Sequence, residues 1–229
     1  MKLQGIAGKG TGKLGAYVWV VRKGEQIVRE YTDKMSNPKS EAQTSQRAKF
    51  KLMSQLTAIV ADALSFIPSN PAESQRNAFA RNNFSLISVS GGAAQINMSA
   101  VRLASGRLVA PIFQVIAGNN GMTITMANPE GWEGFGWAFV MSKSDGTVTG
   151  KSGITARGTS DITIEGIDPL AQRSDVRAYA WRFKDENALA RFQNITAGTT
   201  ASQVKLQFTS MVNSGEIITS ETVTAAIMS

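Results

Sequence analysis

The chain has 229 residues, 42% of them hydrophobic, and it contains neither cysteine nor histidine. This length and apolar content are ample for a folded core. Without cysteine there is no disulfide framework and no thiolate metal site, and without histidine the commonest general base and the commonest transition-metal ligand are missing. No apolar run is long enough to cross a bilayer, and the first residues lack the apolar stretch of a secretory signal. We therefore expect a product of the cytosol, or one that is packaged there.

The net charge of +7 lies entirely in the first quarter of the chain. Residues 1–51 contain eleven Lys and Arg against four acids, whereas residues 52–229 contain thirteen of each. A basic region joined to a neutral body is a common way to present cations to phosphates, because counterion release rewards local cation density. The alternative is that these cations only solvate a hairpin and a helix face.

A glycine-dense segment, residues 5–15, opens this basic region. It partly matches the phosphate-loop pattern G-x-x-x-x-G-K-[ST] through Gly12 and Lys13. However, Ala7 stands where the first glycine belongs, Leu14 replaces the hydroxyl that would bind Mg²⁺, and the residues that follow are strand-like. The segment therefore predicts a mobile basic arm, or one threaded through a neighbouring subunit, rather than a nucleotide site.

Two β-branched and aromatic runs, residues 16–21 and 26–31, follow with a glycine-containing turn between them. This pattern predicts a β-hairpin. Alternation places Tyr17 and Trp19 on one face, and both faces are apolar enough to need cover from the long helix, the body or another copy of the chain. The alternative is that these two aromatic side chains stack on bases.

Two helices are expected next, each opened by the same Ser-Asn-Pro triplet. Asn37-Pro38 and Asn70-Pro71 each fit a helix cap followed by a first turn. The first helix, of about seven turns, carries an apolar stripe at three- and four-residue spacing. The stripe comprises Phe50, Met53, Leu56, Val60, Ala63, Leu64 and Ile67. The second helix offers Phe79 and Phe84 to cover it.

The strings Gly12-Lys13-Leu14-Gly15 and Asn37-Pro38, the latter followed by Gln46-Arg47-Ala48-Lys49-Phe50, resemble the N-terminal signature of a poorly characterised group of proteins encoded by gut bacteria and their phages. Residues 76–84 are similar to a second segment of such proteins. The resemblance covers residues 5–85 and is only architectural beyond them. It implies a non-enzymatic protein of phage type, virion-associated or DNA-binding, found in the virion or the host cytoplasm.

From residue 86 onward, short apolar or alternating segments separated by turn signals predict strands. The expected strands are Leu86–Val89, Gln95–Leu103, Leu108–Val115, Met122–Met126, Gly136–Met141, Asp161–Ile164, Val176–Phe183, Gln203–Phe208 and Glu216–Val223. Their spacing predicts an antiparallel β-sandwich, either immunoglobulin-like or jelly-roll. The expected fold class is α+β, with a basic arm, a β-hairpin and two helices in residues 1–85 and the sandwich in residues 86–229.

Trp132 and Trp137, set among glycines, are the one unusual local feature of this body. They could form a ligand platform on a loop. The alternative, which we favour, is a glycine-bent strand that buries Trp137 while Trp132 caps an edge. No pair of acids is singled out for glycosidase chemistry, and no Asp/Asn loop is tight enough for calcium. We expect no catalytic residue, no metal and no cofactor.

These observations favour a phage-type structural protein that contacts nucleic acid, in the first place DNA, by charge neutralisation without base reading. The cations assigned to this contact are Lys9, Lys13, Arg22, Lys23, Arg29, Arg47, Lys49 and Lys51. The body would pack against further copies or other virion proteins, with no membrane and no small-molecule substrate. One alternative is a tail or head-decoration recognition module that uses the basic arm as an anchor. Another is a β-sandwich hydrolase, which the lack of His and Cys disfavours.

Overall fold

The computed structural model describes residues 11–22, 24–33, 39–66, 72–118, 120–127, 130–143, 146–166, 173–196 and 200–228. The chain divides into two compact units, Met1–Ser40 and Glu41–Ser229. We call the first the arm unit and the second the body. This division differs from the boundary expected at residue 85. The reason is that the first helix packs against strands of the body, so that the helical region and the sheets share one core.

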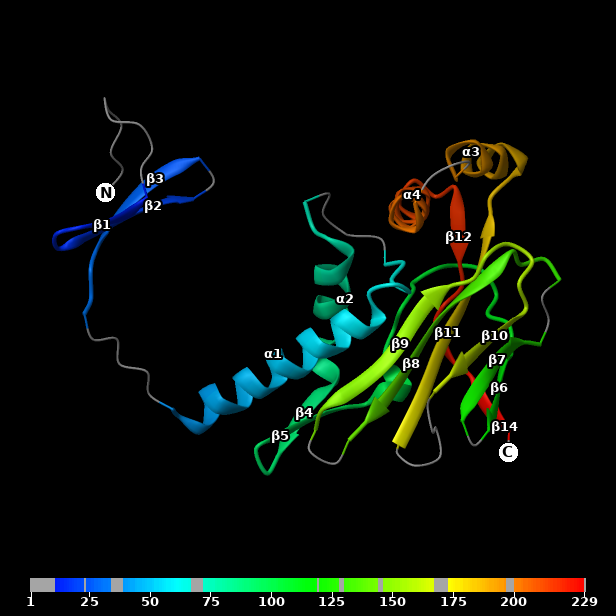
Figure 1. Ribbon diagram of the computed structural model, residues 1–229, viewed down its shortest axis with the longest axis horizontal. Coiled ribbons are helices and arrows are strands. Elements are labelled where there is room, and N and C mark those ends of the chain that lie inside the picture. The colour runs from blue at the N-terminus through cyan, green and yellow to red at the C-terminus, as the bar shows by residue number, and fades with distance from the viewer. Residues whose placement is uncertain are drawn as a thin grey trace. The chain divides into compact units, whose positions relative to one another are not determined.

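The arm unit is a three-stranded antiparallel sheet in the order β1-β2-β3 (Figure 1). Its strands are β1 Gly12–Leu14, β2 Tyr17–Arg22 and β3 Glu25–Glu30. The predicted hairpin is thus confirmed, and the end of the glycine-dense segment adds β1 to it. Gly15 lies in the β1–β2 turn at a φ of 58°, a left-handed backbone that favours glycine. None of the side chains that are described between residues 11 and 33 is buried.

The body is α+β, and its sheets are mostly antiparallel. One sheet has the order β12-β11-β8-β9, with β13 also paired to β11; a second has the order β10-β7-β6-β14, in which β14 runs parallel to β6. A separate hairpin joins β4 and β5. The strand bounds are β4 Ile87–Ser90, β5 Ala93–Ile96, β6 Phe113–Gly118, β7 Gly121–Met126, β8 Gly134–Ser142, β9 Val148–Ile154, β10 Asp161–Glu165, β11 Arg173–Phe183, β12 Ile217–Thr219, β13 Val223–Thr224 and β14 Ala226–Met228.

Two strands of the first sheet, β8 and β11, are covered on both faces. Because successive side chains of a strand point to opposite faces, Phe135, Trp137 and Phe139 of β8 face the second sheet and help to form the core between the two sheets. Tyr179 and Trp181 of β11 face the other way, into a core that the helices cover. Burial raises the pKa of the Tyr179 hydroxyl, and neighbouring Ser65 lowers it by a smaller amount.

Helix α1, Glu41–Val60, crosses β9 and the β4–β5 hairpin (Figure 1). It buries Leu52, Met53, Leu56 and Val60, and the last three confirm the central part of the predicted apolar stripe. The amino-terminal end of that stripe is not buried, because Phe50 is exposed. The centroid of its ring lies 4.9 Å from that of the Phe84 ring. The cap predicted at Asn37-Pro38 lies outside the described residues.

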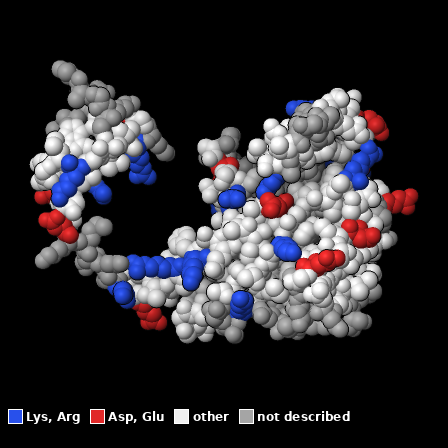
Figure 2. All heavy atoms as spheres, in the orientation of Figure 1, with Lys and Arg blue, Asp and Glu red and all other residues white. Residues whose placement is uncertain are grey.

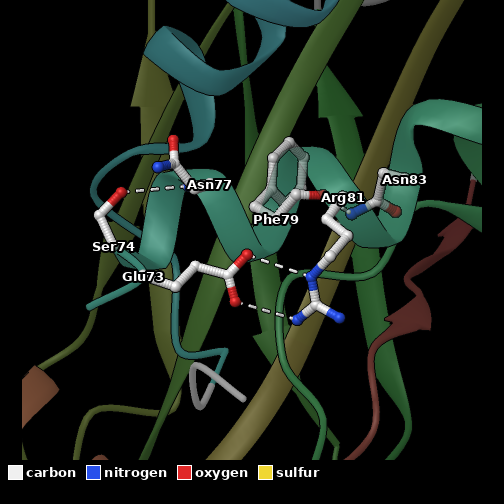
Figure 3. Close-up of polar contacts among 6 residues, drawn as sticks. All are labelled: Glu73, Ser74, Asn77, Phe79, Arg81 and Asn83. Atoms are coloured by element: carbon white, nitrogen blue, oxygen red, sulfur yellow. Dashed lines mark hydrogen bonds and ion pairs between the residues drawn. The ribbon is translucent and has the colours of Figure 1, made fainter. Parts of the chain in front are cut away.

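Helix α2, Gln75–Asn83, begins later than predicted, and Asn70-Pro71 lies outside the described residues. Its N-cap is Ser74, whose hydroxyl accepts a hydrogen bond from the Asn77 backbone N–H at 3.2 Å (Figure 3). At the other end Asn83 is buried and donates through Nδ2 to the Phe79 carbonyl at 2.9 Å. From Asn83 the chain continues directly into the 3₁₀ turn Phe84–Leu86.

The C-terminal half contains two helices that the sequence did not predict: α3, Glu186–Thr196, and α4, Ala201–Asn213. The strand expected at Gln203–Phe208 is therefore wrong. Thr200 and Gln203 form a capping box that starts α4. The inward residues are Phe208, Met211 and Val212, at helical spacing, whereas Leu206 is exposed. The alternation of Val204, Leu206 and Phe208 that suggested a strand is incidental.

Two other predicted strands are shorter than expected. The segment Gln95–Leu103 leaves its strand after Ile96 and forms the 3₁₀ turn Met98–Ala100, and the segment Leu108–Val115 becomes a strand only at Phe113. Among the described residues, no helix combines the length and hydropathy that a membrane span requires.

A buried arginine on β11 fastens the C-terminal segment to the body. Arg177 donates through Nε to the Val101 carbonyl at 3.0 Å and through Nη1 to the Thr224 hydroxyl. Burial lowers the pKa of its guanidinium, and Asp175 partly offsets that effect. Since an arginine remains charged even so, these contacts satisfy a cation inside the fold, and Arg177 is a structural residue.

Candidate nucleic-acid interface

The three described cations of the arm unit that were predicted to bind nucleic acid share one face of its sheet. Val18 on the central strand pairs with Lys13 on one side and with Arg29 on the other, so the two cations lie in one cross-strand row. Arg22 points to the same face by alternation and pairs with Glu25. We call this the basic face. It holds three cations and one acid, and all four side chains are exposed.

Tyr31, which was not among the residues predicted to bind nucleic acid, also belongs to the basic face. The Lys13 ammonium lies 3.5 Å from the centre of the Tyr31 ring, a cation–π contact. Tyr31 is held at the end of β3, where its backbone N–H donates to the Ala16 carbonyl at 2.7 Å, and its side chain is 39% exposed. An exposed ring beside Lys13 and Arg29 is the combination on which single-stranded bases stack.

The opposite face of the same sheet is apolar. Register places Tyr17 opposite Glu30 and Trp19 opposite Val28, and Leu14 beside Tyr17. Tyr17 and Trp19, the residues that were considered for base stacking, therefore lie on the face away from the cations. The aromatic side chain that accompanies the cations is Tyr31 instead.

The remaining described cations of the predicted set belong to the body and lie on α1. Arg47 and Lys51 are four residues apart, both exposed, and on the side of the helix opposite to buried Leu56. Lys49 is half-buried and lies on the side of the helix that carries Met53 and Leu56. Figure 2 shows Lys and Arg side chains along the amino-terminal part of α1. Lys9 and Lys23 lie outside the described residues.

One arginine of the second helix is engaged in an ion pair. Arg81 of α2 donates through Nε and Nη2 to the two carboxylate oxygens of Glu73, each at 3.1 Å (Figure 3). This bidentate pair joins Glu73, just before the N-cap, to the last turn of α2 and cancels the charge of Arg81.

The two tryptophans proposed as a ligand platform do not form an exposed pair. Trp137 is 6% exposed and belongs to the core between the sheets. Trp132 is half-buried against that core, and its indole N–H donates to the Val109 carbonyl at 3.2 Å. This arrangement matches the favoured alternative of a buried Trp137 and a Trp132 at the edge.

No group of three or more acidic, histidine or cysteine side chains in the described part of the chain is placed to hold a metal ion. No protein-family model, no curated protein and no solved structure matches the chain.

Proposed function

We propose that this chain is a non-enzymatic structural protein of phage type, associated with the virion, that contacts DNA non-specifically through its basic N-terminal region. One observation carries the proposal. The entire net charge of +7 lies in residues 1–51, and the described cations that form the basic face and the outward side of α1 are exposed. Exposed cations without a shaped pocket suit phosphate neutralisation, which needs no base-edge contacts.

The body has a different part in this proposal. Its two sheets share one core, which supports an antiparallel β-sandwich of immunoglobulin-like or jelly-roll type with helices on one outer face. Residues 52–229, which make up most of the body, hold thirteen cations and thirteen acids, and this balanced part is suited to packing on further copies or on other virion proteins. The alternative, a tail or head-decoration recognition module, would use Trp132 and Trp137 as its ligand platform, and the burial of Trp137 disfavours it.

The test is the binding of a labelled duplex to the full chain, by fluorescence anisotropy across a salt series. Lys13→Gln with Arg29→Gln removes the cross-strand cations, and Arg47→Gln with Lys51→Gln removes those of α1. Each double variant is expected to lower the slope of log affinity against log salt by up to about 1.8, since each phosphate contact contributes about 0.9.

The matched control is Lys151→Gln with Lys184→Gln, which removes the same charge from exposed positions of the body. It should leave the slope unchanged. The proposal fails if the full chain does not bind at low salt, or if the control lowers the slope as much as either test variant.

A further inference from the structure

An apolar pocket of about 670 Å³ opens on the body, where β9 and β11 meet α3 and α4. Its apolar walls are Ile154, Trp181, Phe192, Val204 and Phe208. The Trp181 ring is held edge-on against Phe208, with centroids 5.3 Å apart, and against Phe183 at 5.5 Å. A volume of this size lies within the range of small-molecule sites, about 300–1,000 Å³. The proposed DNA contact makes no use of it.

Positive groups outnumber negative ones at this pocket. Lys205 and Arg157 both line it, whereas Asp62 is the one acid among its lining residues. Ser202, in the first turn of α4, lines it too, so the positive end of that helix dipole lies at the same place. Two cations, each held in an ion pair, and the amino-terminal end of a helix thus lie at one apolar cavity.

Both cations are held by ion pairs near the surface. Lys205 pairs with Asp62, whose side chain is 66% exposed, so an anion can replace this carboxylate at little cost. Arg157, whose side chain is 49% exposed, pairs through Nε with Glu133, and a guanidinium carries five N–H donors in all.

We propose that this pocket binds an amphipathic carboxylate, a molecule with an apolar chain or ring and one anionic end. The apolar part lies against Trp181 and Phe208, and the carboxylate binds Lys205 in place of Asp62 and accepts from the guanidinium of Arg157. A neutral apolar molecule would fill the same walls but leave the cations in their surface pairs. The inference stands apart from the DNA-binding proposal and does not depend on it.

The test is isothermal titration of the full chain with three probes: octanoate, 1-octanol and propanoate. Octanoate is expected to bind saturably, one per chain. 1-Octanol, which keeps the chain but lacks the charge, should bind at least about tenfold more weakly, because it loses a charge-assisted hydrogen bond. Propanoate, which keeps the charge but lacks the chain, should give no binding at the same concentrations. Absence of octanoate binding, or equal binding of octanol, overturns the proposal.

Two variants locate the binding. Lys205→Gln, which removes the charge without placing a second carboxylate against Asp62, should weaken octanoate at least about tenfold. Its matched control, Lys184→Gln, makes the same charge change at an exposed position outside the pocket and should leave the affinity unchanged. Val204→Trp, which fills the cavity, should abolish binding. Equal losses in the two lysine variants, or normal binding in Val204→Trp, would place octanoate elsewhere and overturn the assignment.

Discussion

The arm unit and the body differ in how many side chains they bury and in where they carry charge. The body buries side chains on both faces of β8 and β11, and after residue 51 its cations and acids are equal in number. The described strands of the arm unit bury none, yet one face of the sheet holds Lys13, Arg22 and Arg29. A sheet of three short strands without a buried core is marginal by itself. In the arm unit, binding charge is therefore separate from the burial that stabilises the body, whereas α1 carries both a buried face and exposed cations.

The largest expected effect comes from making the same substitution, leucine to alanine, once in each unit. Leu56→Ala removes a side chain that is 0% exposed on α1, whereas Leu14→Ala removes one that is 69% exposed on β1. Leu56→Ala should lower the free energy of unfolding by about 2–5 kcal/mol, because it leaves a cavity in the core. Leu14→Ala should change it by less than about 0.5 kcal/mol. Urea unfolding followed by circular dichroism measures both.

The two variants also decide whether the arm unit is independent of the body. If Leu14→Ala destabilises the chain as strongly as Leu56→Ala, the arm unit contributes to the folding of the body and the separation is wrong.

The part of the fold that could be predicted from sequence is the part whose local pattern agrees with its packing. The hairpin of the arm unit and the apolar face of α1 follow from alternation and from 3.6-residue spacing. Strand β9 was missed because its sequence is polar and contains Gly150 and Gly153. Packing requires a glycine at position 150, where a Cβ would lie 2.0 Å from the Phe139 carbonyl oxygen, and leaves little room at Gly153, where one would lie 3.2 Å from the Trp137 ring. Tertiary contacts, rather than local propensity, therefore determine that this segment forms a strand.

The candidate site was predictable in composition but not in arrangement. The sequence identifies Lys13 and Arg29 as members of a basic region. Their common row depends on the pairing of β1 with β2, and a three-residue segment beside glycines does not predict that pairing. Tyr31 was overlooked, although it lies two residues after Arg29 and alternation would have placed both on one face. The apolar pocket needed α3 and α4, and neither helix was predicted.

Two tyrosines on opposite faces of the arm sheet give a smaller test of the same comparison. Tyr31 lies on the basic face and Tyr17 on the apolar face, 39% and 55% exposed. Tyr31→Ala should weaken binding of a single-stranded oligonucleotide by about 1 kcal/mol, or about fivefold, because one stacking surface is lost. Tyr17→Ala should leave that affinity unchanged. Fluorescence anisotropy with a labelled oligonucleotide measures both.

The outcome also distinguishes the use of the two faces. If Tyr17→Ala weakens the binding and Tyr31→Ala does not, bases stack on the apolar face, and the basic face acts only through its charge.

The smallest expected effect concerns a charge that the body uses for stability. A hydrogen bond from the Ser214 hydroxyl to Glu216, 2.7 Å long, lowers the pKa of that carboxyl, and Arg191, 2.6 Å from the other oxygen, lowers it further. A carboxyl whose pKa is lower in the folded state stabilises the fold above its unfolded pKa, and this contribution is lost as the pH falls through the folded value.

Glu216→Gln should therefore lower the melting temperature slightly at pH 7 and have no effect in acid, well below about pH 4.3, the ordinary pKa of a glutamate. Thermal unfolding of both chains between pH 7 and pH 2 measures the difference. Arg191→Gln should reproduce part of the change at pH 7, because Ser214 still donates to the carboxylate. A deficit in Glu216→Gln that persists undiminished at pH 2 would show that the side chain acts by packing, and that the body gains nothing here from its paired charge.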